Sequence, residues 1–165
     1  IYAHLKQKER EWTSMSNFII ERMTRVDVAQ VEAIEQEIFS VPWSEKSFID
    51  ACETKENVYI VCKDNGKVLG YCGMWTVLGE GNITNMAVAK EYRRQGIAKL
   101  LMSEMERISI EENGVDVFFL EVRQSNENAK KLYEKMGYKP IGTRKRFYEK
   151  PVEDAIVMSK MTVTK

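Results

Sequence analysis

The most informative stretch of the sequence is MAVAKEYRRQGIAKLL, residues 86–101. A predicted strand ends in it, a short loop follows, and a helix opens at residues 93–98 and runs to about residue 113. Gly96 allows the backbone to approach a ligand, and the N–H groups and dipole at a helix start attract anions. The stretch therefore predicts a strand–loop–helix unit that is either an anion site or an ordinary helix start with solvated arginines.

The loop lacks the spacing of the common nucleotide-binding motifs. It contains neither GxGxxG nor GxxxxGKS/T, so a nucleoside triphosphate is not indicated. Arg93, Arg94 and Lys99 would place positive charge at its rim. A pyrophosphate group bound without Mg²⁺ fits these features better.

The flanking segments predict a mixed α/β domain with a largely antiparallel sheet. Tight turns at residues 64–67 and 79–81 would join three consecutive strands into a meander. In chain order, we expect a strand at 17–21, helices at 25–39 and 44–53, strands at 57–63, 68–78 and 82–89, a helix from 93–98 to about 113, a strand at 117–122, a helix at 127–136, and strands at 138–148 and 154–162.

Length and charge indicate one domain and exclude several classes of partner. The 165 residues match a single domain at about 150 residues each, which we place at residues 17–165 after an N-terminal tail at residues 1–16. Lys plus Arg and Asp plus Glu both number 25, so no global positive field favours direct binding to nucleic acid. The longest charge-free stretch, residues 68–79, is shorter than the roughly 20 residues of a membrane span. No secretory signal is evident, and we expect a cytoplasmic protein that does not bind membranes.

Histidine and cysteine usage narrows the chemistry. The single histidine, His4, lies in the tail, which argues against Ser-His-Asp and Cys-His catalysis and against histidine-ligated metal sites. Cys52, Cys62 and Cys72 form no CxxC pair and suit reduced, packed thiols. Proton transfer would then fall to carboxylates, Tyr, Lys or Cys, and we expect no metal.

The 86–101 stretch resembles the acetyl-coenzyme A signature of the GCN5-related N-acetyltransferase (GNAT) superfamily. Over about residues 17–161 the chain resembles, within it, the bacterial ribosomal-protein-alanine N-acetyltransferases. Further blocks that carry this resemblance are FSVPWS at 39–44, LEVRQSN at 120–126, LYEKMGY at 132–138, and Tyr148 with EDA at 153–155.

The resemblance implies a fold, a cosubstrate and an acceptor. The fold would be a mixed, mostly antiparallel central sheet of about seven strands flanked by about four helices. Acetyl would pass from acetyl-CoA directly to the N-terminal alanine amine of a ribosomal protein. The residues implied to bind acetyl-CoA are Met86, Ala87, Val88, Arg93, Arg94, Gln95, Gly96, Ile97, Ala98, Lys99 and Asn126.

Glu121 and Tyr133 are the candidate catalytic residues. Glu121 is the single ionisable residue in the apolar strand 117–122, where desolvation would make its carboxylate a better proton acceptor. By spacing alone it could equally face water at a sheet edge, and Tyr133 could equally point into a core. The resemblance implies that Glu121 is the general base and that Tyr133 protonates the leaving thiolate. It also implies that a backbone N–H near Met86 or Ala87, freed by a bulge, binds the thioester oxygen.

Trp43 and Tyr148 are the candidates for the acceptor side. Each combines an apolar body with a polar tip, although Trp43 could instead anchor the core. Residues 147–151, FYEKP, depart from the paired tyrosines followed by proline that are frequent in the family. The resemblance therefore does not define the shape of the acceptor site. Alternative functions are acetylation of a protein lysine or a small, polyamine-like amine, and a non-catalytic module that binds acetyl-CoA or a partner. Product analysis would separate the acceptors.

The tail has two explanations. Residues 1–14 faintly resemble the C-terminus of the bacterial protein that helps to make threonylcarbamoyladenosine on tRNA, which in some bacteria is fused upstream of an acetyltransferase. The tail could therefore indicate fusion to, or association with, that protein. It could equally be an ordinary extension. Neither explanation gives it a role in the chemistry.

Overall fold

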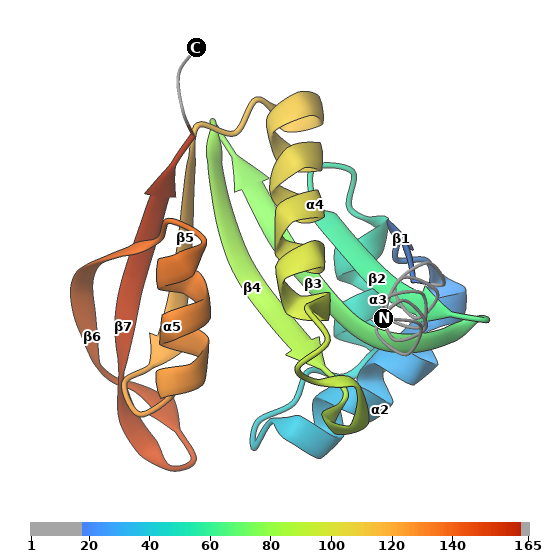
Figure 1. The fold of residues 1–165 in the computed structure, drawn as a ribbon, viewed down its shortest axis with the longest axis horizontal. Helices are drawn as coiled ribbons and strands as arrows, with labels where there is room; N and C mark the ends of the chain where they lie inside the picture. The colour runs from blue at the N-terminus through green and yellow to red at the C-terminus, as the bar shows by residue number, and fades with distance from the viewer. Residues whose placement is uncertain (1–17, 163–165) are drawn as a thin grey trace, which may run out of the picture.

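The computed structural model describes residues 18–162, which form a seven-stranded sheet with helices on both faces (Figure 1). The mixed α/β fold predicted from the sequence is confirmed, whereas the predicted tail, His4 and residue 17 lie outside the described residues. The elements are β1 (Ile19–Arg22), α2 (Val28–Ile38), α3 (Glu45–Glu53), β2 (Val58–Asp64), β3 (Lys67–Val77), β4 (Glu80–Val88), α4 (Ile97–Asn113), β5 (Val117–Arg123), α5 (Glu127–Lys135), β6 (Lys139–Glu149) and β7 (Val152–Met161), with 3₁₀ turns at Arg25–Asp27 and Lys90–Tyr92.

Local hydrogen bonds start the helices where the sequence predicts. Thr24 and Asp27 form a capping box before α2. Ser44 Oγ accepts the N–H of Ser47 at 3.2 Å before α3, and Asn126 Oδ1 accepts that of Ala129 at 3.2 Å before α5. These bonds satisfy N–H groups that have no carbonyl partner inside the helix.

One of the two predicted turns needs correction. The β2–β3 turn is at Asn65 and Gly66, as expected, with φ of 47° and 79°. The second turn, expected at residues 79–81, is at Leu78 (φ 48°) and Gly79 (φ 84°). Residues 80 and 81 instead pair with residues 77 and 76 as the start of β4. The two-residue hairpin needs two consecutive positive φ values, and Leu78 supplies the first although its side chain disfavours that conformation.

The sheet separates two apolar cores. In Figure 1, α4 and α5 lie in front of the sheet, and α2 and α3 lie behind it. The front core includes Leu101, Met105, Phe118 and Tyr133, whereas Phe48, Tyr59 and Tyr71 belong to the rear core. Cys62 and Cys72 are buried, Cys52 is half-buried, and all three thiols are free, as predicted.

Strands β4 and β5 pair only at their ends. They are the parallel neighbours in the sheet, and their register covers residues 80–82 with residues 117–119. Beyond this point the two strands diverge, as Figure 1 shows, while β5 stays paired with β7 along its length. The order of the sheet is β1-β2-β3-β4-β5-β7-β6. The divergence therefore separates two neighbouring strands in the middle of the sheet.

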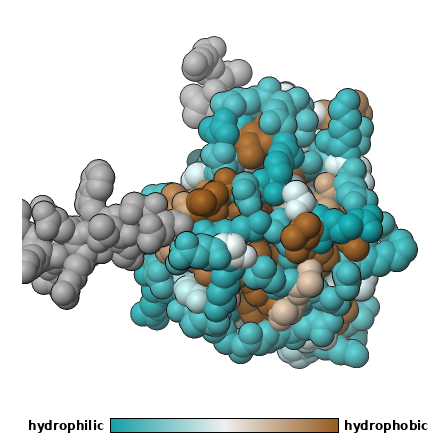
Figure 2. Space-filling view, turned by 90° about the vertical axis from the view of Figure 1, so that its right-hand side faces the viewer, coloured by the Kyte–Doolittle hydropathy of each residue, from teal (hydrophilic) through white to brown (hydrophobic). Residues whose placement is uncertain are grey.

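Apolar atoms are scattered over the side of the molecule near β1. Figure 2 shows brown, hydrophobic spots there among mainly teal, hydrophilic side chains. Among the helices of residues 18–162, none combines the length and the apolar character that a membrane crossing requires.

Candidate active site

The start of α4 forms an open cradle of backbone N–H groups. Gly96 caps the helix with φ of 80°, and no atom of another residue lies within 4 Å of the position a Cβ would take. The first helical bond runs from the N–H of Leu100 to the carbonyl of Gly96 at 3.1 Å. The N–H groups of residues 97–99 therefore have no acceptor within the helix and can face an anion.

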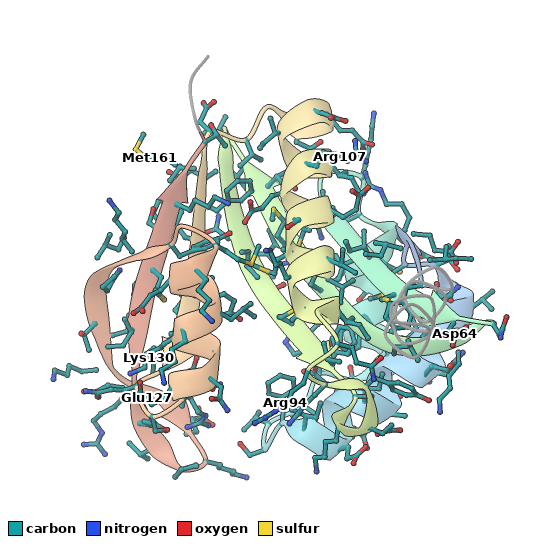
Figure 3. The ribbon with its side chains drawn as sticks, viewed as in Figure 1. Asp64, Arg94, Arg107, Glu127, Lys130 and Met161 are labelled. Carbon is teal, nitrogen blue, oxygen red and sulfur yellow. The ribbon has the colours of Figure 1, made fainter. Side chains whose placement is uncertain are left out.

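Two cations border this cradle. Arg94, labelled near the N-terminal end of α4 in Figure 3, and Lys99 are exposed, and neither forms an ion pair within residues 18–162. Arg93 has another role, because its Nε donates to the carbonyl of Val88 at 3.2 Å. That bond ties the loop to the end of β4.

Several residues predicted to bind acetyl-CoA could contact it only through their backbone. The side chain of Ile97 lies in the front core, and that of Ala87 lies in the rear core. Gln95 is exposed, Ala98 is half-buried, and Asn126 uses its side chain to cap α5. Direct side-chain contact is therefore open chiefly to the exposed Arg94, Gln95 and Lys99.

The backbone of β4 presents polar groups to the diverging side. The N–H of Ala89 donates to the carbonyl of Leu69 on β3 at 2.8 Å. Because successive residues of a strand alternate, the N–H groups of Met86 and Val88 point away from β3. The predicted bulge is present but lies at Thr84, where the register steps from the pair Gly73–Asn85 to the pair Met74–Ile83.

Glu121 faces the rear of the sheet. Its neighbours Leu120 and Val122 are buried in the front core, so strand alternation turns Glu121 to the opposite face. Its side chain is 26% exposed, and Oε1 lies 3.5 Å from Nε of Arg144 on β6. Local sequence patterns could not indicate this cation, because Arg144 lies in a different strand, 23 residues further along the chain. The role of Glu121 as general base stays a prediction.

Tyr133 approaches from the front of the sheet. It is buried on α5, with its ring 6.0 Å from that of Tyr138. Its hydroxyl makes no hydrogen bond within the described residues. It is not fully enclosed either, because the one fully enclosed side-chain polar atom there that lacks a partner is Asp64 Oδ1. The Tyr133 hydroxyl is therefore reachable from open space. Burial raises the pKa of Tyr133 above its ordinary value, which keeps the phenol protonated at neutral pH.

Trp43 lies at the edge of a groove on the rear face. Its ring packs against Phe48 at 5.4 Å, yet it also lines an open groove of about 410 Å³ between α3 and the sheet. Trp75 on β3, which is 49% exposed, forms another wall that the sequence analysis did not anticipate. Trp43 thus both anchors the rear core and lines this groove.

Tyr148 packs against Arg123, which lies two residues beyond Glu121 on β5. The guanidinium of Arg123 stacks over its ring at 4.2 Å. Burial raises the pKa of Tyr148 to about 12, and the negative charge of Glu121 nearby contributes in the same direction while Arg123 opposes it. Burial is the main cause of the raised pKa of Tyr133, and Tyr148 contributes in the same direction.

Two distant segments meet beside the site. Ser40 Oγ, in the α2–α3 loop (residues 39–44), donates to the carbonyl of Lys150 at 2.5 Å in the β6–β7 turn. Arg123 donates to the carbonyls of Lys150 and Pro151 at 3.2 and 3.1 Å. The loop and the turn therefore form a bridge near Glu121, and local sequence patterns could not indicate it because the partners are 110 residues apart.

Comparison with known proteins agrees with this arrangement. The sequence model of the acetyltransferase (GNAT) family matches residues 28–138. A Bacillus subtilis protein provisionally named as a ribosomal protein bS18-alanine N-acetyltransferase is 36% identical over 140 residues, covering 84% of this chain and 92% of the relative. The Haemophilus influenzae protein of that name is 34% identical over 146 residues, covering 86% and 97%. The crystal structure of the Escherichia coli ribosomal-protein-S18-alanine N-acetyltransferase superimposes with a TM-score of 0.81 at 31% identity, covering 90% and 96%. The chain belongs to the acetyltransferase (GNAT) family.

Proposed function

We propose that the protein transfers an acetyl group from acetyl-CoA to the α-amine of an N-terminal alanine on a ribosomal protein. The observation that carries the proposal is the divergence of β4 and β5 between an anion cradle and a carboxylate–tyrosine pair. The names of the relatives supply the acceptor. Such an acceptor would place the reaction in the cytoplasm.

The cradle fits the diphosphate of acetyl-CoA. The N–H groups of residues 97–99 are directed at a space that a side chain at Gly96 would begin to fill. Arg94 and Lys99 add positive charge without being neutralised by a described partner. The free N–H groups of Met86 and Val88 could bind the pantetheine arm and the thioester oxygen.

The catalytic pair would act from opposite faces of the sheet. The amine nitrogen attacks the thioester carbon, the carbon–sulfur bond breaks, and the acetyl group moves directly to the amine. Glu121, on the rear face, accepts a proton from the amine. Tyr133, on the front face, donates its phenolic proton to the departing thiolate. No covalent enzyme intermediate is required.

A carboxylate base favours an α-amine over a lysine. The pKa of an α-amine is about 7.7 to 8.0 and that of a lysine about 10.4, so far more of the α-amine is neutral at pH 7. The difference of about 2.5 units corresponds to roughly 3.4 kcal/mol. The rear groove at Trp43 and the bridge at Ser40 lie on the side of the sheet where Glu121 would receive that amine.

Product analysis tests the proposal. The purified protein would be given acetyl-CoA with a peptide that begins with Ala and contains one Lys, with the same peptide blocked at its α-amine, and with a polyamine. We expect thiol release and a single acetyl group at the α-amine of the free peptide. Acetylation of the blocked peptide or of the polyamine at the same rate would contradict the proposed acceptor.

A further inference from the structure

A buried carboxylate on α2 has no place in the chemistry described so far. Glu35 is 3% exposed, on a helix face whose other buried residues are Val28, Val31 and Ile34. A carboxylate removed from water is costly unless donors replace its hydration. The surroundings of Glu35 therefore show what it holds in place.

The polar neighbours of Glu35 come from three separate segments. Oε1 accepts the backbone N–H of Trp43 at 3.2 Å, in the α2–α3 loop. Oε2 accepts the hydroxyl of Tyr71 on β3. Burial raises the pKa of Glu35, and the nearby side chain of Asn85 on β4 is among the polar groups that oppose this shift. Glu35 makes no ion pair within residues 18–162, so neutral donors alone replace its hydration.

The β4 partner lies next to the bulge. Asn85 follows Thr84, and the bulge turns both of these consecutive side chains to the rear face. There the hydroxyl of Tyr59 lies 2.6 Å from Oγ1 of Thr84 and 3.4 Å from Oδ1 of Asn85. The ring of Trp43 packs against the ring of Tyr59 at 6.3 Å. Glu35 thus connects the α2–α3 loop to the part of β4 from which the free N–H of Met86 projects.

We propose that Glu35 is a positioning residue that fixes the α2–α3 loop, and with it Trp43 and the rear groove, relative to β4. It touches none of the reacting atoms. The inference rests on the proposed function in one respect, namely that this loop and groove receive the acceptor. Loss of Glu35 should therefore weaken use of the acceptor and leave use of acetyl-CoA unchanged, because the cradle at α4 is on other elements and β4 stays paired with β3 along its length.

The chemistry of the carboxylate suggests graded substitutions. Glutamine keeps one acceptor oxygen for the N–H of Trp43, but it replaces the other acceptor oxygen with an amide group that can only donate. Alanine removes every acceptor. Tyr71→Phe removes a single donor and leaves the bond to Trp43. Glu32→Gln is the matched control, because Glu32 lies one turn earlier on α2 and contacts Gln36 only through an exposed bond.

Steady-state kinetics with each substrate varied in turn test the proposal. For Glu35→Gln we expect KM for the acceptor to rise on the order of 10-fold, consistent with the loss of one hydrogen bond to a charged group. The KM for acetyl-CoA should stay within about two-fold of the parent, and Tyr71→Phe should give a smaller rise. Equal rises in both KM values, or kinetics like those of Glu32→Gln, would overturn the proposal.

Hydrogen exchange separates this outcome from failure of the proposed acceptor. The amide of Trp43 should exchange faster in Glu35→Gln and faster still in Glu35→Ala, while amides in the middle of α4 exchange as in the parent. Unchanged exchange at Trp43 would overturn the proposal whatever amine the enzyme acetylates. If the parent acetylates an amine other than an N-terminal alanine, the proposed function fails, and the same KM comparison is made with that amine.

Discussion

Gly96 shows how one backbone conformation prepares a binding site. Its φ of 80° is costly for any residue with a Cβ, and it turns the chain into α4 without a side chain in the cradle. Gly66 provides a matched comparison in a distant turn, because its φ is 79° and its Cβ position is equally open.

We expect Gly96→Ala and Gly66→Ala to lower the free energy of unfolding by similar amounts, about 1 kcal/mol, because the backbone strain is the same. Only Gly96→Ala should weaken acetyl-CoA binding, on the order of 10-fold, since the added carbon meets the diphosphate. Calorimetric titration of both variants measures this. If both variants bind acetyl-CoA with the same affinity, the cradle is not part of the acetyl-CoA site.

Glu121→Gln should lower kcat/KM on the order of 100-fold near pH 7, because the amine then loses its proton acceptor. The deficit should shrink as pH rises through the pKa of the acceptor amine, since a neutral amine needs no base. Arg144→Met is the control, as it removes the cation beside Glu121 and keeps the carboxylate. A pH-independent deficit would argue against the role of base.

Tyr133→Phe should lower kcat on the order of 100-fold and leave the Kd of acetyl-CoA unchanged, because it removes the proton donor and keeps the ring. Burial raises the pKa of Tyr133 above its ordinary value of about 10. In the parent, ionisation of this residue should therefore cause no loss of rate between neutral pH and about pH 10. Tyr138→Phe, which removes a hydroxyl bonded to Glu106 beside the same ring, should reduce stability and spare kcat. A pH–rate profile compares the three proteins.

At the scale of elements, β6 brings Tyr148 to the site through a large bulge. Residues 145–147 stand opposite Asp154 alone, between the pairs Arg144–Ala155 and Tyr148–Glu153. Asp154 accepts the N–H of Arg146 at 2.8 Å, and its Oδ2 lies 3.2 Å from Nζ of Lys145. These two contacts lower the pKa of Asp154.

The lowered pKa fixes the sign of a prediction for acid. Because the folded state holds Asp154 ionised, its contribution to stability is present above its ordinary pKa of about 3.9 and is lost as pH falls through the lowered value. Asp154→Ala should therefore reduce the thermal midpoint at pH 7, and the difference from the parent should narrow toward pH 2. A constant difference across this range would contradict the contribution of the charge.

At the scale of the whole molecule, residues 18–162 contain both cores, the complete sheet and every predicted site residue. We therefore expect a chain that starts at Met15 to keep the thermal midpoint of the parent within about 2 °C and to keep its rate with the Ala peptide, since it retains all of these parts. Thermal unfolding and thiol release measure the two quantities. Loss of activity with unchanged unfolding would assign residues 1–14 a part in the site.

The elements, including the glycine at the start of α4, could be predicted from sequence because their causes lie within a few residues. Ser44 and Asn126 cap helices through bonds three residues away, and Asn65 with Gly66 makes a turn by its own backbone preference. Gly96 before an apolar helical repeat indicated the helix start for the same reason, and anion binding there stays a prediction. The turn at Leu78 was misplaced because its residue type opposes its conformation.

The relations across the site depended on the tertiary structure. The divergence of β4 from β5, the cation beside Glu121 and the bridge from Ser40 to Lys150 all involve segments far apart in the chain. The pairing of the strands and the packing of the loops against the sheet decide which of these segments meet. Glu35 left a local sign, a carboxylate four residues after Val31 on the apolar face of α2. Its partners could not be named from that sign, because burial in a folded core determines which distant donors replace the water that a carboxylate would otherwise bind.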